Sequence, residues 1–356
     1  MSEFGQYKKI GDPDKRKKAE NWRIAIGLQQ VDGLTPSQNL IKIATDNIEG
    51  KISVEEAEQQ ITAFYLQNPP GTLDEQNERE ADEVSSRINK LLSKNAFTFS
   101  PAEYIAIHKH LFTGILDAKT TGKLRNYDIT KAEPILQGDT VQYGSALNLR
   151  ETLDYDFAQE KKFSYKGLSK KQAAAHVAEF TSSLWQIHPF GEGNTRTTAV
   201  FLIKYLRLLG FKADNALFEE NALYFRNALV RANYKNLEYG IDKTTEYLDR
   251  FFGNLLFGEK HALKNRDLLI LHAPENHQKT TRKPPENHQK ILQTLAHKPT
   301  ASRQELSLLL GITENQVRGA INKLRDAGAI RRVGPDKGGY WEVQNGGKDA
   351  SYFVPE

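Results

Sequence analysis

The chain contains no cysteine, which excludes disulfide bonds and thiolate metal sites. It also lacks any apolar run that approaches the ~18 residues of a membrane-spanning helix. The N-terminal stretch MSEFGQYKKIGDPDKRKK is polar and has no apolar core of the kind found in secretory signals. Because the absence of cysteine suits a reducing compartment, we expect a cytoplasmic protein that does not associate with membranes.

The composition is that of an ordinary globular protein. Hydrophobic residues make up 38% of the 356 residues and charged residues 26%, so the chain can bury a substantial core. This length predicts two or three domains. The formal net charge of +4 is small, and it permits contact with nucleic acid without requiring it.

Residues 1–70 are predicted to form a small helical module behind a solvated tail at 1–20. An apolar helical pattern begins at Trp22, and two further helices follow it. Ser37 and Ser53 precede these two helices and can cap their N-termini. The sequence Asn-Pro-Pro-Gly then breaks the helical pattern and ends the module.

Residues 71–258 are predicted to form the main domain, in which helices surround one irregular segment. The expected helices cover 73–94, 101–112, 145–157, 169–186, 199–209, 217–233 and 240–257. His108 and His110 are interpreted as packing or surface histidines. Two short β-type runs flank a Gly-Asp pair within 134–143, which predicts a β-hairpin that lies along a ligand.

The C-terminal part is predicted to be a separate winged helix-turn-helix unit. Residues 259–286 are interpreted as a polar linker, since Pro-Glu-Asn-His-Gln-Lys at 274–279 recurs at 285–290. Residues 287–345 then show three helical segments and a β-hairpin, which is the winged-helix pattern. A tail follows at 346–356.

The third helix of this unit carries polar and basic side chains of the types that contact DNA bases and phosphates. The wing adds basic residues, among them Arg332 and Lys337. The candidates for DNA contact are Asn315, Gln316, Arg318, Asn322, Lys323 and Arg331. A winged helix used only for protein contact is the alternative.

The strongest chemical signal is the string Trp-Gln-Ile-His-Pro-Phe-Gly-Glu-Gly-Asn-Thr-Arg at 185–196, between two apolar helical runs. Gly193 permits close backbone approach to an anion, and the helix N-terminus that follows favours phosphate. Arg196 adds a fork of donors for phosphate oxygens. Glu192 could hold Mg²⁺, and His188 has the pKa range of a general base. Together these residues indicate transfer of a phosphorus group to a nucleophile that His188 deprotonates; the alternative is a polar loop with a hydrogen-bonded histidine.

The string HPFGEGNTR at 188–196 resembles the signature of Fic-domain proteins, His-x-Phe-x-Asp/Glu-Gly-Asn-Gly-Arg-x-x-Arg. The resemblance implies a mainly α fold: a Fic-type helical core with a β-hairpin flap, an N-terminal helical module and a C-terminal winged helix-turn-helix. It also implies a nucleotidyltransferase that uses ATP and Mg²⁺ and moves AMP to a Ser, Thr or Tyr hydroxyl of a target protein. The hairpin at 134–143 resembles the family's flap, which aligns the target segment by β-strand addition.

The same resemblance assigns roles to individual residues. It makes His188 the base and Glu192 the Mg²⁺ ligand, and it makes Phe190 the anchor of the loop in the core. The residues that it implies for nucleotide binding are Gly193, Asn194, Thr195, Arg196, Phe225 and Asn233.

Two positions depart from the family pattern. Thr195 stands in place of the second glycine, and Ala199 stands in place of the final arginine, which holds the γ-phosphate in the family. Arg226 or Arg231 could substitute for that arginine. Each charged hydrogen bond that is removed could cost about 1.5–3 kcal/mol of phosphate binding. The activity could therefore be weak, or the nucleotide could be a different one.

The missing arginine also bears on the N-terminal module. Family inhibitory motifs read Ser/Thr-x-x-x-Glu-Gly/Asn, and Thr45–Gly50 fits this pattern with Glu49 as the carboxylate. The layout of 22–66 instead resembles a fused Fic antitoxin module, in which Asp32 at the end of the first helix takes that position. We favour Asp32 and keep Glu49 as the alternative. We further expect the carboxylate to have lost its role, because its arginine partner is absent.

The sequence therefore predicts a protein adenylyltransferase that is autoregulated by its N-terminal module. The alternative is a DNA-binding transcriptional regulator with a Fic fold and weak or altered transfer activity. The target protein, the nucleotide, any DNA sequence and the formation of a homodimer stay open.

Overall fold

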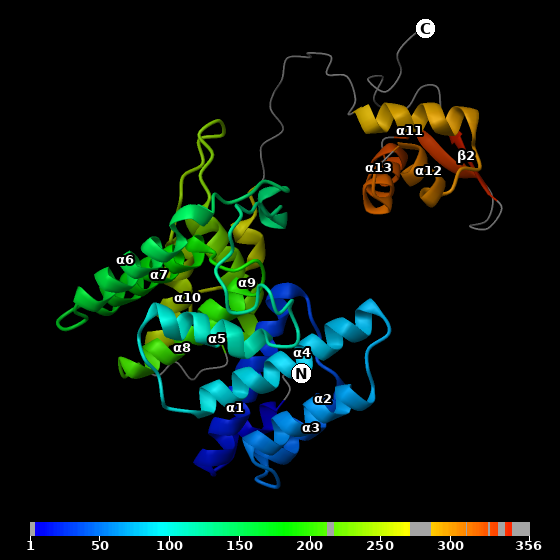
Figure 1. Ribbon diagram of the computed structural model, residues 1–356. Coiled ribbons are helices and arrows are strands. Elements are labelled where there is room, and N and C mark those ends of the chain that lie inside the picture. The colour runs from blue at the N-terminus through cyan, green and yellow to red at the C-terminus, as the bar shows by residue number, and fades with distance from the viewer. Residues whose placement is uncertain are drawn as a thin grey trace. The chain divides into compact units, whose positions relative to one another are not determined.

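The computed structural model describes residues 4–211, 217–270, 286–310, 312–326, 328–333 and 339–343. The chain divides into two compact units, Met1–His272 and Ala273–Glu356 (Figure 1). Lys337, the tail at 346–356 and most of the predicted linker lie outside the described residues. No helix in the described part of the chain is long and apolar enough to cross a membrane.

The N-terminal part of the first unit is helical from its beginning. A 3-10 helix, η1 (Gly5–Lys9), precedes α1 (Pro13–Gly27). Phe4 and Tyr7 are buried in the core of this part. The predicted solvated tail at 1–20 is therefore wrong, because two aromatic side chains bury enough apolar surface to fix the segment.

The rest of the N-terminal module follows the predicted capping pattern. After η2 (Leu28–Asp32), the helices α2 (Gln38–Ile48) and α3 (Val54–Gln67) begin. The hydroxyls of Ser37 and Ser53 accept hydrogen bonds from the first turns of these two helices, as predicted.

Helix α1 belongs to two apolar cores at once. Trp22 and Ile26 pack with α2 and α3, whereas Ile24 and Ala25 join the core of the main domain. Gly27 lies so close to α9 (Leu217–Asn233) that an added Cβ would stand 2.2 Å from the Cα of Glu219. The N-terminal module is thus packed directly against the main domain.

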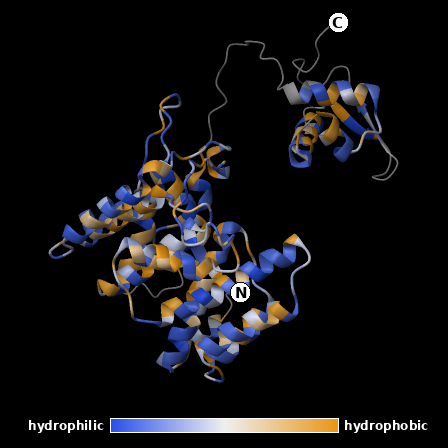
Figure 2. Cartoon of the chain, viewed as in Figure 1, coloured by the Kyte–Doolittle hydropathy of each residue, from blue (hydrophilic) through white to orange (hydrophobic). Residues whose placement is uncertain are grey.

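The main domain is a set of helices around one central, buried helix. Its helices are α4 (Leu73–Ser93), α5 (Pro101–Phe112), α6 (Leu149–Lys162), α7 (Lys170–Ile187), α8 (Asn194–Leu208), α9 (Leu217–Asn233) and α10 (Glu246–Phe257), with short 3-10 turns η3 (Pro134–Leu136), η4 (Ala146–Asn148) and η5 (Asn265–Leu268). Every residue of α8 from Asn194 to Leu206 is buried, as its apolar sequence predicts. Figure 2 shows hydrophobic and hydrophilic residues alternating along most of the other helices, as expected for helices that bury one face.

The predicted hairpin at 134–143 is not formed. Pro134 begins η3 instead, and Gln137 takes a left-handed conformation with φ 55°. The base of this loop is closed by a hydrogen bond from the backbone N–H of Glu133 to the carbonyl of Asp139, at 2.8 Å. The prediction failed because the loop satisfies its backbone through tight turns rather than through strand pairing.

The main domain also extends beyond its predicted end at 258. Leu268 is buried, and the backbone N–H of Ile270 donates to the carbonyl of Ile135 over 2.8 Å. The first part of the predicted linker, up to Ile270, is therefore part of this unit.

The second unit has the predicted winged-helix arrangement. It contains α11 (Glu286–His297), α12 (Arg303–Leu310), α13 (Glu314–Asp326) and the strands β1 (Ile330–Val333) and β2 (Tyr340–Val343). The two strands pair antiparallel and are the only strands assigned among the described residues. The mainly helical fold with a winged helix-turn-helix is thereby confirmed.

Candidate active site

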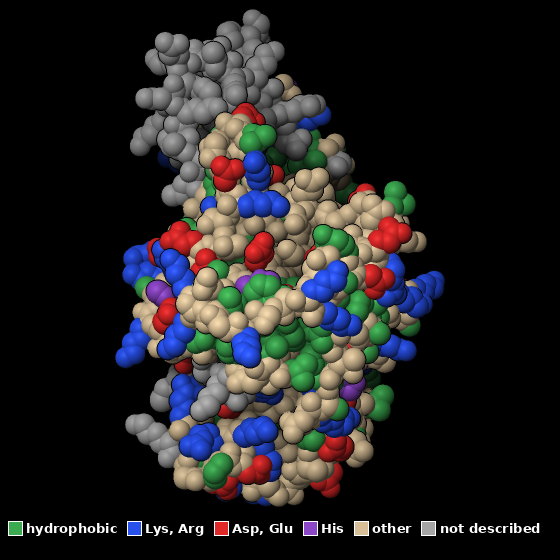
Figure 3. Space-filling model, turned by 90° about the vertical axis from the view of Figure 1, so that its left-hand side faces the viewer, with side chains coloured by type: hydrophobic (Ala, Val, Ile, Leu, Met, Phe, Trp, Pro, Cys, Tyr) green, Lys and Arg blue, Asp and Glu red, His purple; other side chains and the backbone are tan. Residues whose placement is uncertain are grey.

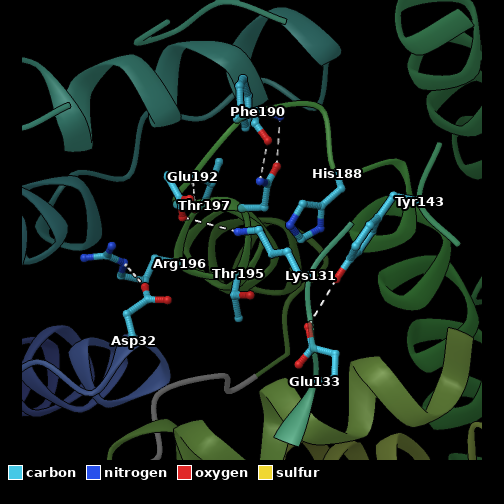
Figure 4. Close-up of polar contacts among 12 residues, drawn as sticks. Asp32, Lys131, Glu133, Tyr143, His188, Phe190, Glu192, Thr195, Arg196 and Thr197 are labelled. Atoms are coloured by element: carbon cyan, nitrogen blue, oxygen red, sulfur yellow. Dashed lines mark hydrogen bonds and ion pairs between the residues drawn. The ribbon is translucent and has the colours of Figure 1, made fainter. Parts of the chain in front are cut away.

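The candidate site is built on the connection between α7 and α8 together with the first turn of α8, and we call this stretch the signature loop (His188–Arg196). Helix α7 ends at Ile187, and His188 takes a left-handed conformation with φ 48° and ψ 57°. This turn directs the chain from α7 back toward the N-terminus of α8 (Figure 4). A non-glycine residue in this conformation is strained, which fits a position fixed for function.

His188 is held as a neutral imidazole. Its Nδ1 lies 3.2 Å from the carbonyl oxygen of Trp185, so Nδ1–H donates and Nε2 is left as an acceptor. Burial is the main cause that lowers the pKa of His188 well below its usual value, and the charge of Lys131 lowers it further. The side chain therefore has the protonation state that a general base needs at neutral pH.

Arg125 fixes the position of His188, and sequence analysis missed it. Its Nε donates to the carbonyl of His188 at 2.8 Å, and its backbone N–H donates to the carbonyl of Pro189 at 2.9 Å. The other guanidinium nitrogens donate to the carbonyls of Tyr127 and Gly144. Arg125 lies in a segment without periodicity, so no pattern in the sequence distinguished it from a surface arginine.

His108 supports the middle of the signature loop from α5. Its ring stacks on Phe190 with centroids 3.7 Å apart, and burial lowers its pKa to about 4. Its Nδ1 accepts from the backbone N–H of Gly122 at 3.0 Å, so Nε2–H donates to the carbonyl of Glu192 at 3.1 Å. The interpretation of His108 as a packing histidine is confirmed, and Phe190 is fully buried.

The side-chain amide of Asn194 stabilises the signature loop. Its Oδ1 accepts from the backbone N–H of Phe190 at 3.0 Å, and its Nδ2 donates to the carbonyl of Phe190 at 2.8 Å. The residue is also 2% exposed. Both ends of the amide thus close the turn, and the expected contact of Asn194 with phosphate stays a prediction.

The N-terminus of α8 is formed around Gly193. Gly193 precedes this helix with φ 73°, and no side chain caps the helix. A Cβ at Gly193 would stand 2.4 Å from the ring of Phe112, so only glycine fits here. Thr195 is buried, and its hydroxyl accepts from Trp185 Nε1 at 3.0 Å, so it stabilises the loop. The first turn of α8 thus offers backbone N–H groups to phosphate.

Arg196 is enclosed by residues from outside the loop. Its Nη1 donates to Gln29 Oε1 at 3.0 Å, and its Nε and Nη2 lie 2.8 Å and 2.6 Å from carboxylate oxygens of Asp32 and Glu80. Its guanidinium also lies 4.8 Å from the ring centre of Phe112, and its side chain is 4% exposed. The carboxylate of Asp32 therefore has a partner, contrary to our expectation, and that partner is Arg196.

The second inhibitory candidate, Glu49, has its contacts elsewhere. Its carboxylate accepts from the Tyr7 hydroxyl at 2.5 Å and from Lys15 Nζ at 2.5 Å. Both partners belong to the N-terminal module, so these contacts close the module on itself.

The carboxylate of Glu192 is exposed and forms an ion pair that it can exchange for another partner. Its side chain is 67% exposed, and its Oε2 lies 3.2 Å from Lys131 Nζ (Figure 4). The described residues contain no group of three or more potential metal ligands. A single accessible carboxylate next to a phosphate site nevertheless fits Mg²⁺, which takes one or two carboxylates and completes its shell with phosphates and water.

The remaining nucleotide candidates, Phe225 and Asn233, are buried in the main domain. Phe225 is fully buried among other aromatic rings, and Asn233 donates to the carbonyl and hydroxyl of Ser182. Both side chains have packing contacts in this structure, and their assignment to nucleotide binding stays a prediction. Arg226 pairs with the buried Glu133 at 2.7 Å, and Arg231 is half-buried, with its charged form penalised by that burial, which lowers its pKa.

In the second unit, the predicted DNA-contact side chains are exposed. The exposed residues are Asn315, Gln316, Arg318, Asn322, Lys323 and Arg331. Arg331 also pairs with Glu342 at 2.8 Å on the opposite strand of the wing.

Comparisons with known proteins agree with this division. The Fic/DOC family model matches residues 98–206, and a winged helix-turn-helix DNA-binding model matches residues 285–331. No curated protein matches the chain.

Among solved structures, a Fic family protein from Desulfovibrio desulfuricans G20 is 16% identical with a TM-score of 0.44, and the match covers 98% of this chain and 95% of that one. BepC from Bartonella tribocorum, solved with bound AMPPNP, is 19% identical with a TM-score of 0.39, over 53% of this chain and 90% of that one. By the two family models, the chain contains a Fic/DOC domain at 98–206 and a C-terminal winged helix-turn-helix domain at 285–331.

Proposed function

We propose that the Fic/DOC domain is a protein adenylyltransferase, which moves AMP from ATP to a hydroxyl side chain of a target protein. The observation that carries this proposal is the state of His188. A buried, neutral imidazole presents Nε2 beside an uncapped helix N-terminus. A base and an anion site in one loop are the two parts that transfer of a phosphorus group to a hydroxyl requires.

In the proposed reaction, His188 Nε2 takes the proton of the target hydroxyl. The hydroxyl oxygen forms a bond to the α-phosphorus, the bond from that phosphorus to the bridging oxygen breaks, and pyrophosphate leaves. The N–H groups at the start of α8 bind the phosphate charge. Glu192 would hold Mg²⁺, which neutralises charge on the phosphates.

The segment at 140–144 is the proposed neighbour of the target side chain. The backbone N–H of Gly144 donates to the carbonyl of Gln186 at 3.1 Å, and Gln186 Nε2 donates to the carbonyl of Gln142 at 2.9 Å. The ring of Tyr143 lies 4.2 Å from that of His188. This extended segment, rather than a hairpin, runs beside the base.

The N-terminal module is proposed to restrain the reaction through Arg196. The guanidinium donates hydrogen bonds to Glu80 and Gln29 and forms an ion pair with Asp32. It cannot turn to a phosphate without breaking the two charged hydrogen bonds, each worth about 1.5–3 kcal/mol, and the ion pair. Activation then requires that η2 moves, or that the nucleotide supplies an equivalent negative charge.

The proposal is tested with ATP labelled at the α-phosphate, and in parallel at the γ-phosphate, in a lysate with Mg²⁺. We expect α-label on protein with the wild type and more with Asp32→Asn, and none with His188→Ala. Transfer of the γ-label alone would instead indicate that the protein transfers the terminal phosphoryl group of ATP. Label equal to that of His188→Ala in both the wild type and Asp32→Asn would end the transferase proposal.

The alternative function is that of a DNA-binding regulator with weak transfer activity. It is favoured by the exposed polar and basic face of α13 in a unit that matches a DNA-binding family. We expect the full chain to bind random duplex at low salt. The double variant Arg318→Ala/Lys323→Ala should lower the salt slope by roughly 0.9 for each phosphate that it no longer neutralises. Lys166→Ala, on an exposed loop of the first unit, is the control. Absence of binding at low salt would exclude this function.

A further inference from the structure

Lys131 occupies a fixed position beside the signature loop. Its backbone N–H donates to the hydroxyl of Thr140 at 3.2 Å, at the base of the loop that Glu133 and Asp139 close. Glu133 is fully buried and pairs with Arg226 at 2.7 Å. The chain is therefore anchored at Lys131 itself and two residues later at Glu133, and the side chain of Lys131 reaches the site from a defined point.

The ammonium group of Lys131 lies between the base and the proposed metal ligand. Its Nζ is 3.2 Å from Glu192 Oε2, and its charge contributes to the lowered pKa of His188. Figure 4 shows the side chain passing between His188 and Glu192 in front of α8. The side chains of Lys131 and Glu192 are 31% and 67% exposed, so a ligand can reach both.

The arginine side chains near the loop are bound to partners inside the fold. Arg196 is enclosed by two carboxylates and an amide, and Arg226 is paired with the buried Glu133. Arg125 donates to main-chain carbonyls on several sides. Lys131 has a single accessible carboxylate as its partner, and it can leave that partner at the lowest cost.

We infer that Lys131 binds the phosphate chain of the substrate and that its ion pair with Glu192 is the arrangement before ligand binding. This inference rests on the proposed function, since it names a further substrate-binding residue of the same site. Before binding, Lys131 balances the charge of Glu192. If Glu192 held a divalent cation, the ammonium group of Lys131 would be released to pair with phosphate oxygens. Lys131 thus supplies a positive charge at a site where the family's final arginine is replaced by the buried, apolar Ala199.

This arrangement predicts two effects of opposite sign in one variant. Lys131→Gln removes a phosphate ligand, so ATP and inorganic pyrophosphate should bind about tenfold more weakly. The same change removes a competitor for Glu192, so Mn²⁺ without nucleotide should bind more tightly. A lysine with a purely structural role would weaken both ligands or neither.

The experiment uses the full chain and measures ATP, pyrophosphate and adenosine by calorimetry and Mn²⁺ by electron paramagnetic resonance. Adenosine affinity should not change, because it has no phosphate, and Lys131→Arg should keep pyrophosphate affinity. Lys119→Gln is the matched control, since Lys119 is exposed and its side chain has no hydrogen bond or ion pair among the described residues. Glu192→Gln should remove the gain in Mn²⁺ affinity.

The outcomes separate this inference from the proposed function. If ATP binds through Lys131 but no α-label is transferred, the function fails and the inference stands. The inference is overturned if Lys131→Gln keeps wild-type affinity for ATP and pyrophosphate, or if its Mn²⁺ affinity does not rise. It is also overturned if neither the wild type nor Asp32→Asn binds any of the phosphate ligands.

Discussion

The two ends of the signature loop are held by different kinds of contact. At the first end, His188 is fixed by main-chain groups and by Arg125, all within the main domain. At the other end, Arg196 is held by Gln29 and Asp32 of the N-terminal module and by Glu80 of α4. The base is thus preorganised by the fold itself, whereas the guanidinium depends on charges that another module brings.

This difference has a consequence for regulation. Main-chain hydrogen bonds to a buried turn persist as long as the domain is folded. An ion pair with a carboxylate that is 41% exposed can open without unfolding of the domain, because water can replace each partner. The fold therefore fixes the position of His188, the proposed base, and leaves Arg196 as the part of the loop whose contacts can change.

The largest expected effect is on stability and lies between the two ends. Gly193→Ala places a Cβ against Phe112 at a positive φ and should lower the free energy of unfolding by about 3 kcal/mol. Gly210→Ala, at the other end of α8 with φ 84° and open space, should cost only about 1 kcal/mol. Urea unfolding of both variants tests this. Equal losses of stability would show that Phe112 yields and that the turn is not tightly packed.

The second effect concerns the pH dependence of stability that the buried His108 contributes. The pKa of His108 is lowered to about 4 in the folded state from 6.5, so the unfolded state binds more protons between these values. Stability is then fully present above pH 6.5 and falls with falling pH, by about 2 kcal/mol between pH 7 and pH 5. The unfolding free energy of His108→Gln should depend less on pH. An unchanged slope would mean that His108 does not contribute.

The third effect distinguishes the two carboxylates of the N-terminal module. Asp32→Asn weakens the enclosure of Arg196 and should raise the rate of AMP transfer about tenfold. Glu49→Gln loosens contacts with Tyr7 and Lys15 and should leave the rate unchanged. Initial rates with α-labelled ATP decide between them. A rise with Glu49→Gln alone would reverse the assignment.

The smallest expected effect is on the rate of AMP transfer, which should not change with pH near neutrality. Because burial holds the pKa of His188 well below 6.5, the base is already deprotonated at neutral pH. The rate of transfer by Asp32→Asn should therefore stay level when the pH falls from about 7.5 to about 6 and decline only below that. A pH–rate profile with its midpoint near 6.5 would show that His188 is solvated in the working enzyme.

The face in Figure 3 explains why the bulk charge of the chain was a weak guide. Lys, Arg, Asp and Glu side chains are interspersed over it, in keeping with the formal net charge of +4. The informative charges are the few that meet in the site, such as Lys131 with Glu192 and Arg196 with Asp32. Composition averages over these pairs and cannot identify them.

Local sequence predicted the elements that local forces decide. Ser37 and Ser53 cap helices where expected, and the apolar run after the signature loop forms the buried α8. The winged-helix unit followed from the same kind of pattern. At 134–143 the β-type residues predicted a hairpin that does not form, because loop closure by Glu133 and Asp139 competes with strand pairing.

The sequence by itself identified a Fic-type loop, because the residues from His188 to Arg196 resemble the family signature. It could not determine what the side chains of that loop contact. Only the tertiary structure brought Arg125, His108, Lys131 and Asp32 to the loop, from segments far away in the chain. Such contacts depend on how helices pack, and packing places side chains together without leaving a periodic trace in the sequence.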